Sequence, residues 1–208
     1  TTRKPSVTDQ TSKPVAVVTG AAGDIGMAIA AQLSASHIIA AVDIDMIALE
    51  GAVESLENHG ADIAAIQCDL TKADDLARLA RDAARLGQVN TIINNAGAAA
   101  ALTLHQMTAE TLSRDLALNL EAALNCFKAF EQPLISSGAG NVVNIASVNG
   151  LSVFGHPAYS AAKAGLIHAT RSIAVEYGKF GIRSNAIAPG TVKTQAWKIR
   201  QAANPDVF

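Results

Sequence analysis

Short apolar runs alternate with longer stretches of helical periodicity along most of the chain. Runs rich in Val, Ile and Ala have the length of buried strands, at residues 16–19, 38–43, 63–67, 91–94, 142–147 and 183–188. Helical patterns fill the gaps, at residues 27–34, 45–58, 73–86, 108–136 and 157–179. This alternation predicts a doubly wound α/β fold with three layers, a mostly parallel sheet and right-handed crossovers.

The same pattern predicts one domain over residues 14–208, after a flexible, polar tail over residues 1–13. The tail lacks the apolar core of a signal peptide. We find neither internal repeats nor a second domain. In a sheet of this kind ligands bind beyond the carboxyl ends of the strands, so we look for chemistry there.

A glycine-rich loop follows the first apolar run. Residues 20–26 read Gly-Ala-Ala-Gly-Asp-Ile-Gly and lead into the first helical stretch. Glycines allow a tight turn and a close approach of the backbone to a pyrophosphate, while the helix N-terminus supplies N–H donors. The loop therefore favours a dinucleotide-binding unit of the Rossmann type, although a plain strand-to-helix turn would have a similar sequence.

An acidic residue ends the second apolar run. Asp43 lies at roughly the ~20-residue distance from the loop at which a carboxylate binds the adenosine ribose. It would accept a hydrogen bond from the 2′-hydroxyl and repel a 2′-phosphate. The loop and residues 44–46 contain no Arg or Lys, so NAD is favoured over NADP. The alternative for Asp43 is a helix cap after a strand.

A tyrosine and a lysine lie four residues apart in the last helical stretch. At helical spacing, Tyr159 and Lys163 project from one face. A nearby cation favours phenolate and moves the pKa of a phenol from ~10 toward the range of a general acid or base. Ser147, twelve residues upstream, could hold a substrate oxygen beside the phenol. The alternatives are a half-buried aromatic with a snorkelling lysine, and a serine that caps a strand end.

As a set, these motifs resemble the short-chain dehydrogenase/reductase family over residues 19–194. The matching residues are Thr19, Gly20, Gly26, Cys68, Asp69, Leu70, Asn94, Asn95, Ala96, Gly97, Asn119, Ser147, Tyr159, Lys163, Pro189 and Gly190. The resemblance implies an NAD(P)-dependent oxidoreductase acting on CH–OH groups.

The resemblance also implies a role for each catalytic residue. Tyr159 would be the acid/base, and Ser147 would orient the substrate oxygen. Lys163 would bind the nicotinamide ribose and lower the Tyr159 pKa. Asn119 would hold a water that extends a proton relay through Lys163; otherwise it is a helix-interior Asn that bends its helix.

The implied cofactor site is larger. Its residues are Gly20, Gly23, Asp24, Ile25, Gly26, Asp43, Asp69, Leu70, Asn95, Ala96, Gly97, Tyr159, Lys163, Pro189, Gly190 and Thr191. Asp69 would lie at the adenine, and Pro189, Gly190 and Thr191 near the nicotinamide. Asn94 and Asn95 could instead be turn residues. We assign no metal ligands.

Two features depart from the family pattern. Asp24 occupies the position of the family's second loop glycine, and we expect it to cap the following helix and complement its dipole. The family continues to about 250 residues through further helices and a last edge strand, whereas this chain ends at Phe208. We therefore expect a sheet that lacks this C-terminal edge strand and a domain incomplete at its C-terminus.

Composition narrows the choice of partners. Hydrophobic residues make up 50% of the chain and charged residues 16%, as in a parallel sheet buried on both faces. A net charge of −2 argues against nucleic acid or an anionic membrane as partner. No apolar run reaches the ~18 residues of a membrane span. Cys68 and Cys126 form no CxxC pattern and predict buried thiols in a reducing compartment, the cytoplasm.

The leading hypothesis is NAD-dependent interconversion of a secondary alcohol and a ketone. One alternative is an NADPH-dependent 3-oxoacyl thioester reductase, and another is a non-catalytic nucleotide-binding protein of the same fold. We expect Asn149, Leu151, His156 and residues 195–197 to border the substrate pocket, with a structural role for His156. Family resemblance implies a homodimer or homotetramer assembled through residues 108–136 and 157–179.

Overall fold

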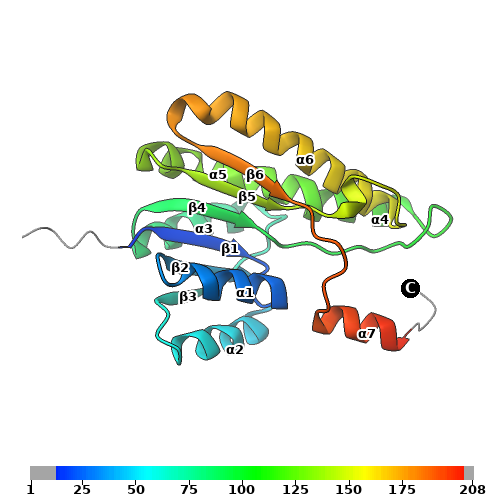
Figure 1. Cartoon of the computed structure of the whole chain (residues 1–208), viewed down its shortest axis with the longest axis horizontal. Helices are drawn as coiled ribbons and strands as arrows, with labels where there is room; N and C mark the ends of the chain where they lie inside the picture. Colours follow the sequence, from blue (N-terminus) through cyan, green and yellow to red (C-terminus); the bar gives the residue numbers. More distant parts are fainter. Residues whose placement is uncertain (1–12, 204–208) are drawn as a thin grey trace, which may run out of the picture.

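The computed structural model describes residues 13–203 and contains a six-stranded sheet in the order β3-β2-β1-β4-β5-β6 (Figure 1). The strands are β1 Val15–Thr19, β2 Ile38–Asp43, β3 Ile63–Gln67, β4 Val89–Asn94, β5 Asn141–Ile145 and β6 Arg183–Ile187. All neighbouring strands in it pair in parallel. This confirms the predicted fold class. Within the described part of the chain, β3 and β6 are the edge strands.

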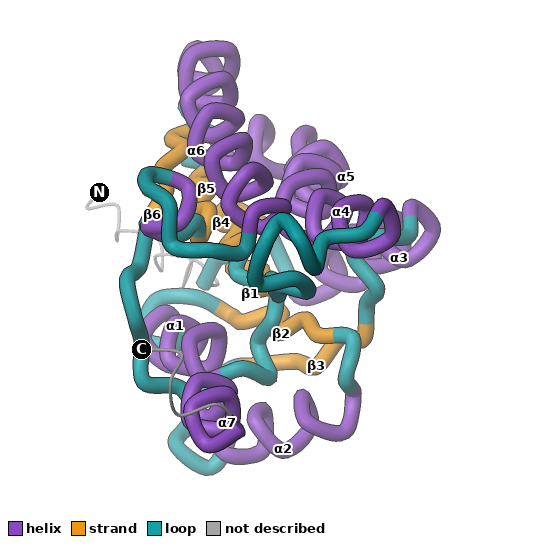
Figure 2. The backbone as a smooth tube through the Cα atoms, turned by 90° about the vertical axis from the view of Figure 1, so that its right-hand side faces the viewer, coloured by secondary structure: helices purple, strands orange, loops and turns teal. Residues whose placement is uncertain are grey.

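Helices cover both faces of the sheet. They are α1 Asp24–Leu33, α2 Met46–Glu57, α3 Ala73–Leu86, α4 Ala109–Leu116, α5 Ala122–Ser137, α6 Pro157–Tyr177 and α7 Gln195–Ala203. Figure 2 looks onto the carboxyl ends of the strands, with α1 and α2 on one side and α3, α5 and α6 on the other. The order therefore reverses between β1 and β4, which creates the crevice where such sheets bind ligands.

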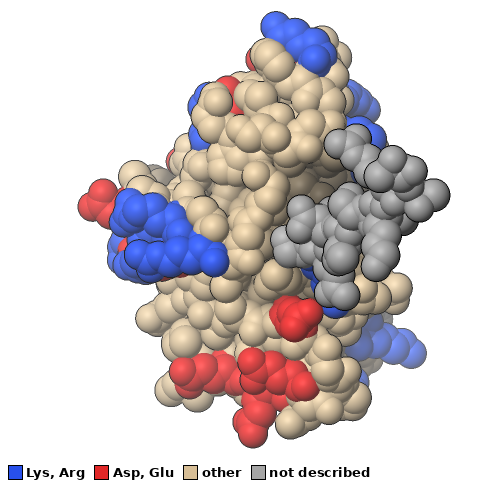
Figure 3. All heavy atoms as spheres, turned by 90° about the vertical axis from the view of Figure 1, so that its left-hand side faces the viewer, with Lys and Arg blue, Asp and Glu red and all other residues tan. Residues whose placement is uncertain are grey.

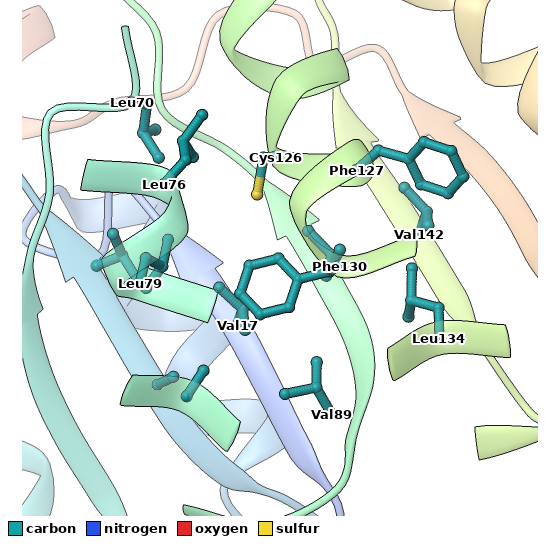
Figure 4. Packing of buried hydrophobic residues seen from close by; sticks show 14 of the residues in the cluster. Val17, Leu70, Leu76, Leu79, Val89, Cys126, Phe127, Phe130, Leu134 and Val142 are labelled. Carbon is teal, nitrogen blue, oxygen red and sulfur yellow. The ribbon is translucent and has the colours of Figure 1, made fainter. Parts of the chain in front are cut away.

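The alternation of side chains along the central strands creates two cores. In β1, Val15 and Val17 point to one face of the sheet, and Ala16 and Val18 to the other. On the first face, Phe130 of α5 and Leu79 of α3 pack against Val17 (Figure 4). A strand buried on both faces needs apolar residues at every position, which is why the sequence shows continuous apolar runs here.

Two predicted helices differ from the structure, and a third helix, α7, was not predicted. The first begins at Asp24 rather than at residue 27, because Gly23 takes the N-cap position in extended conformation. The stretch predicted as one helix over residues 108–136 is divided by η1, a π-helical segment at Ala117–Glu121 that contains Asn119. A periodicity pattern does not reveal such a local widening, because only one extra residue enters the helix.

Part of the predicted tail, residues 1–12, lies outside the described residues. Lys13 is described, and its Nζ donates to Ser34 O at 3.1 Å and to Asp62 Oδ2 at 3.3 Å. Figure 3 shows the face at the amino ends of the strands, where acidic side chains gather toward the lower edge and basic ones lie at the sides and at the top. None of the helices in residues 13–203 combines the length and apolar character that a membrane crossing needs.

Candidate active site

A cleft of about 870 Å³ opens at the carboxyl ends of β1, β2, β3 and β4. Its lining includes a large part of the predicted cofactor site, namely Gly20, Gly23, Asp24, Ile25, Gly26, Asp43, Asp69, Leu70, Asn95, Ala96 and Gly97. These residues come from four segments, which lie at the ends of β1, β2, β3 and β4, and the crossovers of the sheet bring them together. Their role in binding a cofactor remains a prediction, but the fold places them around one cavity.

Glycine is required at two positions of the loop after β1. Gly20 has a φ of +64°, a conformation that side chains disfavour. A Cβ on Gly26 would lie 2.2 Å from the carbonyl oxygen of Gly20, so the first turn of α1 packs directly on the loop backbone. The N-terminus of α1 has no side-chain cap, and its backbone donors are therefore left for a ligand.

Asn95 holds this loop in place. Its Nδ2 donates to Thr19 O at 3.0 Å and to Gly20 O at 3.1 Å, and its backbone N–H donates to Thr19 Oγ1 at 3.0 Å. The loops after β1 and β4 are thus tied together across the crevice. The amide of Asn95 is used inside the protein, so its contribution to the site is to shape the cleft.

Asp43 faces the cleft from the end of β2. Its Oδ2 accepts from Ala22 N at 3.1 Å, and its Oδ1 accepts from Asp45 N at 3.2 Å. It is Asp45, and not Asp43, that caps α2, by accepting from Ala48 N at 3.1 Å. The capping alternative for Asp43 is therefore wrong. Each carboxylate oxygen retains a lone pair that can accept a ribose hydroxyl.

Asp69 belongs to a small polar cluster after β3. Its Oδ1 accepts from the Thr71 hydroxyl at 2.6 Å and from Thr71 N at 3.0 Å, and Lys72 pairs with it at 3.2 Å. The hydrogen bond from the Thr71 hydroxyl is the main cause that lowers the Asp69 pKa from its ordinary value. The carboxylate is thereby kept ionised at the rim of the cleft, beside the nearly buried side chain of Leu70.

The π-helical segment η1 contains Asn119, and the hydrogen bonds of this side chain account for the segment. Asn119 Nδ2 donates to Asp115 O at 2.9 Å, one turn back, and to Ala98 O at 2.7 Å. Because the side chain occupies Asp115 O, the local backbone bonding shifts, and Ala122 N donates to Ala117 O. Asn119 Oδ1 is buried without a hydrogen-bond partner. Asn119 therefore does both things that were predicted as alternatives: its Nδ2 alters the helix, and its Oδ1 is left as an acceptor next to Gly97.

Lys163 is almost fully buried beside Asn119. A Cβ added to Gly97 would lie 2.6 Å from Asn119 Oδ1 and 3.3 Å from Lys163 Nζ, so both groups converge at this glycine of the cleft. Lys163 Nζ donates to Ile145 O at 2.8 Å and lies 5.5 Å from the centroid of the Tyr159 ring. Burial lowers the pKa of Lys163 to about 8. The predicted proximity of Lys163 and Tyr159 is therefore present.

Ser147 follows β5 and is held by Asn149. The Ser147 hydroxyl donates to Asn149 Oδ1 at 3.3 Å and accepts from Asn149 N at 3.2 Å. Asn149 Nδ2 in turn donates to Gly155 O at 3.2 Å and to Ser160 Oγ at 3.3 Å. One amide side chain therefore links Ser147 to the first turn of α6, next to Tyr159.

His156 occupies the N-cap position of α6 with a φ of +51°, which is unusual for a residue with a side chain. Its N–H donates to Leu102 O at 2.8 Å, and its Nδ1 lies 3.1 Å from Ala101 O. Its ring lies edge-on to Tyr159 with centroids 6.4 Å apart. These contacts agree with the structural role expected of His156, because they join the loop before α6 to the loop after β4.

The segment after β6 contacts two parts of the site: its start lies beside Ser147, and its end lines the cleft. Val148 N donates to Pro189 O at 3.1 Å, which brings Pro189 beside Ser147. Gly190 and Thr191 are exposed and lie outside the lining of the cleft, whereas Thr194 and Gln195 belong to it. The predicted cofactor residues Tyr159, Lys163, Pro189, Gly190 and Thr191 thus lie outside the lining of the cleft.

Sequence reasoning missed several residues of the cleft, namely Ala22, Ile44, Thr71, Ala98, Arg114, Ala117, Leu118 and Thr194. Arg114 is notable because it adds a cation to this lining. It lies on α4, five residues before Asn119 in the sequence. This short separation from a predicted site residue is the only sequence signal that could have placed Arg114 near the cleft. The small residues of this set follow no chemical motif and enter the cleft through the fold alone.

Comparison with known proteins agrees with this geometry. The sequence matches the short chain dehydrogenase family over residues 14–204. It is 33% identical over 196 residues to 2-(R)-hydroxypropyl-CoM dehydrogenase of Xanthobacter autotrophicus, which covers 90% of this chain and 78% of that protein. It is 32% identical over 186 residues to a 3-oxoacyl-[acyl-carrier-protein] reductase of Synechocystis, covering 86% and 74%.

Among solved structures, an oxidoreductase of the short chain dehydrogenase/reductase family from Burkholderia thailandensis superposes with a TM-score of 0.86. It is 41% identical, and the match covers 95% of this chain and 76% of that one. The fold and the site define a dinucleotide-dependent oxidoreductase. The chain belongs to the short-chain dehydrogenase/reductase family, whose members use NAD(P)(H).

The residues present fit such a cofactor. The uncapped start of α1 offers backbone donors to a pyrophosphate, and the close packing of Gly26 on Gly20 leaves no side chain in its way. At the other end of the cleft, Asn119 Oδ1 is an orphaned acceptor beside the Lys163 ammonium. Polar groups thus lie at the glycine loop of the cleft and next to Gly97, another residue of its lining.

Proposed function

We propose that the protein interconverts a secondary alcohol and a ketone with NAD(H), and that Tyr159 is the general acid/base. The observation that carries this proposal is the convergence of Lys163 and Asn119 at Gly97, with the Tyr159 ring 5.5 Å from Lys163 Nζ. A buried cation with an acceptor beside it therefore lies close to one phenol, next to Gly97 of the cofactor cleft. A purely structural helix would not need this arrangement of buried polar groups.

In the oxidation direction, the phenolate oxygen of Tyr159 takes the proton of the substrate hydroxyl. The bound nicotinamide supplies the hydride acceptor for the carbinol carbon. Ser147 donates a hydrogen bond to the substrate oxygen, after its hydroxyl turns from Asn149 Oδ1 to the substrate. The Lys163 ammonium stabilises the negative charge of the phenolate. Reduction runs through the same steps in reverse.

The proton then leaves through Lys163 and Asn119. Because burial brings the Lys163 pKa to about 8, this ammonium can lose and regain a proton near neutral pH. The unpaired Asn119 Oδ1 lies beside it at Gly97 and can accept a hydrogen bond from a water that continues the path. An exposed lysine would hold its proton too tightly for this task.

The surroundings of Tyr159 favour an uncharged substrate with an apolar part. Residues 97–109 and 146–162 are the two segments joined at His156, each a loop with the start of the helix that follows it, and neither contains Asp, Glu, Lys or Arg. Their exposed side chains include Leu151, Val153 and Phe154, at 66%, 92% and 60% exposure. A phosphorylated or otherwise anionic reacting group would find no cation in these loops.

The choice of cofactor is tested by exchanging the charge at Asp43. We expect the wild type to oxidise secondary alcohols with NAD in preference to NADP. Asp43→Ser should shift the ratio of kcat/KM for NAD over NADP toward NADP by about 10–100-fold, since a charge-assisted hydrogen bond contributes about 1.5–3 kcal/mol. Because kcat/KM for NAD and for NADP are measured on the same variant, a general loss of activity affects both values and cancels in their ratio.

Asp45→Ser is the matched control, because it removes a carboxylate that caps α2. It should leave the cofactor ratio unchanged, and stability close to wild type, because Ser is also a good N-cap residue. A wild-type preference for NADP, or an equal shift in both variants, would overturn the role of Asp43. If no secondary alcohol or ketone from a broad panel reacts with either cofactor, the proposed reaction is wrong.

The second candidate is an NADPH-dependent 3-oxoacyl thioester reductase, which the similarity to the Synechocystis reductase supports. Asp43 and the uncharged loops around Tyr159 weigh against it, because such a reductase must receive an anionic carrier. Assembly into a homodimer or homotetramer and a location in the cytoplasm stay predictions. The free, buried thiols of Cys68 and Cys126 are compatible with a reducing compartment.

A further inference from the structure

Asp24 makes a contact that links two distant parts of the chain. Its Oδ2 accepts a hydrogen bond from the backbone N–H of Gln195, at 2.5 Å. Asp24 is the first residue of α1, and Gln195 is the first residue of α7, so the N-termini of two helices meet here. Figures 1 and 2 both show α7 beside α1, at the end of a long segment that leaves β6.

The contact completes the N-terminal capping of α7. Thr194 Oγ1 accepts from Trp197 N at 3.1 Å, and Thr194 O accepts from Lys198 N at 2.9 Å. The N–H of Gln195 is not reached by this local cap and donates to Asp24 instead. A carboxylate is also the favoured group at the positive end of a helix dipole. Asp24 therefore caps α7 from outside, and not α1 as its sequence position predicts.

Both partners line the cofactor cleft. Asp24 lies next to Gly23 in the glycine loop, and Thr194 and Gln195 are the part of the C-terminal segment that reaches the cleft. A carboxylate in this loop would repel a pyrophosphate if its charge were left unengaged. The hydrogen bond to Gln195 directs that charge toward α7. It thus accounts for an acidic residue where the family has glycine.

We propose that Asp24 is a positioning residue that holds α7 as a lid over the cofactor cleft. The inference rests on the proposed function in one respect, that the cleft holds a dinucleotide. The lid itself can be tested without any cofactor. Lys193 and Lys198 flank the start of α7 and are exposed, so trypsin can report the opening of this segment.

The experiment compares Asp24→Gly and Asp24→Asn in the 208-residue chain. Asp24→Gly inserts the family's residue and removes the acceptor. Since the loss of a capping hydrogen bond costs about 1 kcal/mol, tryptic cleavage at Lys193 and Lys198 should become about fivefold faster without cofactor. Asp24→Asn should remain close to wild type, because Asn is an equally good capping acceptor.

Asp74→Gly is the control, since it removes an exposed acid from the first turn of α3, away from the cleft. It should leave cleavage at Lys193 and Lys198 unchanged. A second readout, NADH release by stopped-flow fluorescence, should be about fivefold faster in Asp24→Gly than in wild type.

Equal cleavage rates in wild type and Asp24→Gly would overturn the lid contact, as would an Asp24→Asn variant that behaves like Asp24→Gly. The two proposals fail separately. A chain that shows the cleavage pattern but binds no NADH would contradict the cofactor site alone. A chain that binds NADH with identical cleavage in all variants would contradict the lid alone.

Discussion

At the scale of single residues, the central feature is the buried ammonium of Lys163. The side chain is 3% exposed, and burial is the cause that lowers its pKa from 10.5 to about 8. A backbone carbonyl is its hydrogen-bond acceptor, and among residues 13–203 no ion pair with a carboxylate offsets the cost of burying the charge. Burial of the Lys163 ammonium therefore lowers the stability of the folded protein, and it produces a cation that can exchange its proton near neutral pH.

This cost makes the stability of the protein depend on pH in a defined way. Below pH 8, Lys163 is charged in the folded and unfolded states, and the full penalty of burial is present. Between pH about 8 and 10.5 the folded state has released this proton while the unfolded state still binds it, so stability rises with pH.

We expect the free energy of unfolding of wild type, relative to Lys163→Met, to increase by on the order of 3 kcal/mol across that range. Urea unfolding of both proteins at several pH values measures it. The buried thiols, whose pKa values burial raises, titrate in both proteins and cancel in the difference. A difference that stays constant from pH 7 to 10.5 would show that Lys163 is not desolvated.

The proximity of two site residues was predictable from the sequence where both lie on one helix and their spacing places them on the same face. Tyr159 and Lys163 are neighbours because helical pitch makes them so. The Asn149 link between Ser147 and Ser160 was not predictable, because it depends on how the loop before α6 folds back. Arg114 was missed because no motif marks it, and it enters the lining of the cleft from α4.

At the scale of elements, the junction of β1 and α1 is the most constrained part of the site. The first turn of α1 rests on the carbonyl of Gly20, and a Cβ at position 26 would overlap that backbone atom. Backbone cannot move aside as a flexible side chain can. The glycine is therefore needed for the approach of a helix to its loop, independently of any ligand.

Gly26→Ala should destabilise the protein by about 2 kcal/mol or more and abolish NADH binding, because α1 must move away from the loop. Gly51→Ala is the matched control. Gly51 lies inside α2 with nothing within 4 Å of an added Cβ, so alanine should be neutral or stabilise by up to about 1 kcal/mol. Thermal unfolding and fluorescence titration with NADH measure both effects. Equal effects of the two substitutions would refute the close packing at Gly26.

Element positions were predictable where a strand is a continuous apolar run, as in β1, or a helix has a periodic apolar face, as in α3. The π-helical segment at Ala117–Glu121 was not, because it arises from competition between the Asn119 amide and the backbone for one carbonyl. The capping of α1 predicted for Asp24 is wrong, although its carboxylate does lie in the first turn of that helix. Its partner Gln195 lies 171 residues away, and no local pattern indicates such a contact.

At the scale of the whole molecule, the strand order explains how one chain brings the cofactor cleft and the predicted catalytic residues to the same end of the sheet. The order reverses between β1 and β4, and the cofactor cleft opens there. Extension of β5 and β6 then carries Ser147 and Pro189 to the same end of the sheet. Fold class and topology follow from the alternation of strands and helices, whereas the substrate depends on loop side chains that this alternation does not constrain.

The most direct test of the account is the replacement of Tyr159 by phenylalanine. Without the phenolic oxygen, kcat for oxidation of a reactive secondary alcohol should fall by about 10²–10⁴-fold, while NADH affinity stays unchanged. Tyr177→Phe is the matched control, because the other tyrosine of the chain binds Glu131 at 2.9 Å and faces no part of the cleft. It should retain full turnover. If Tyr159→Phe turns over at the wild-type rate, or both variants lose activity equally, Tyr159 is not the acid/base.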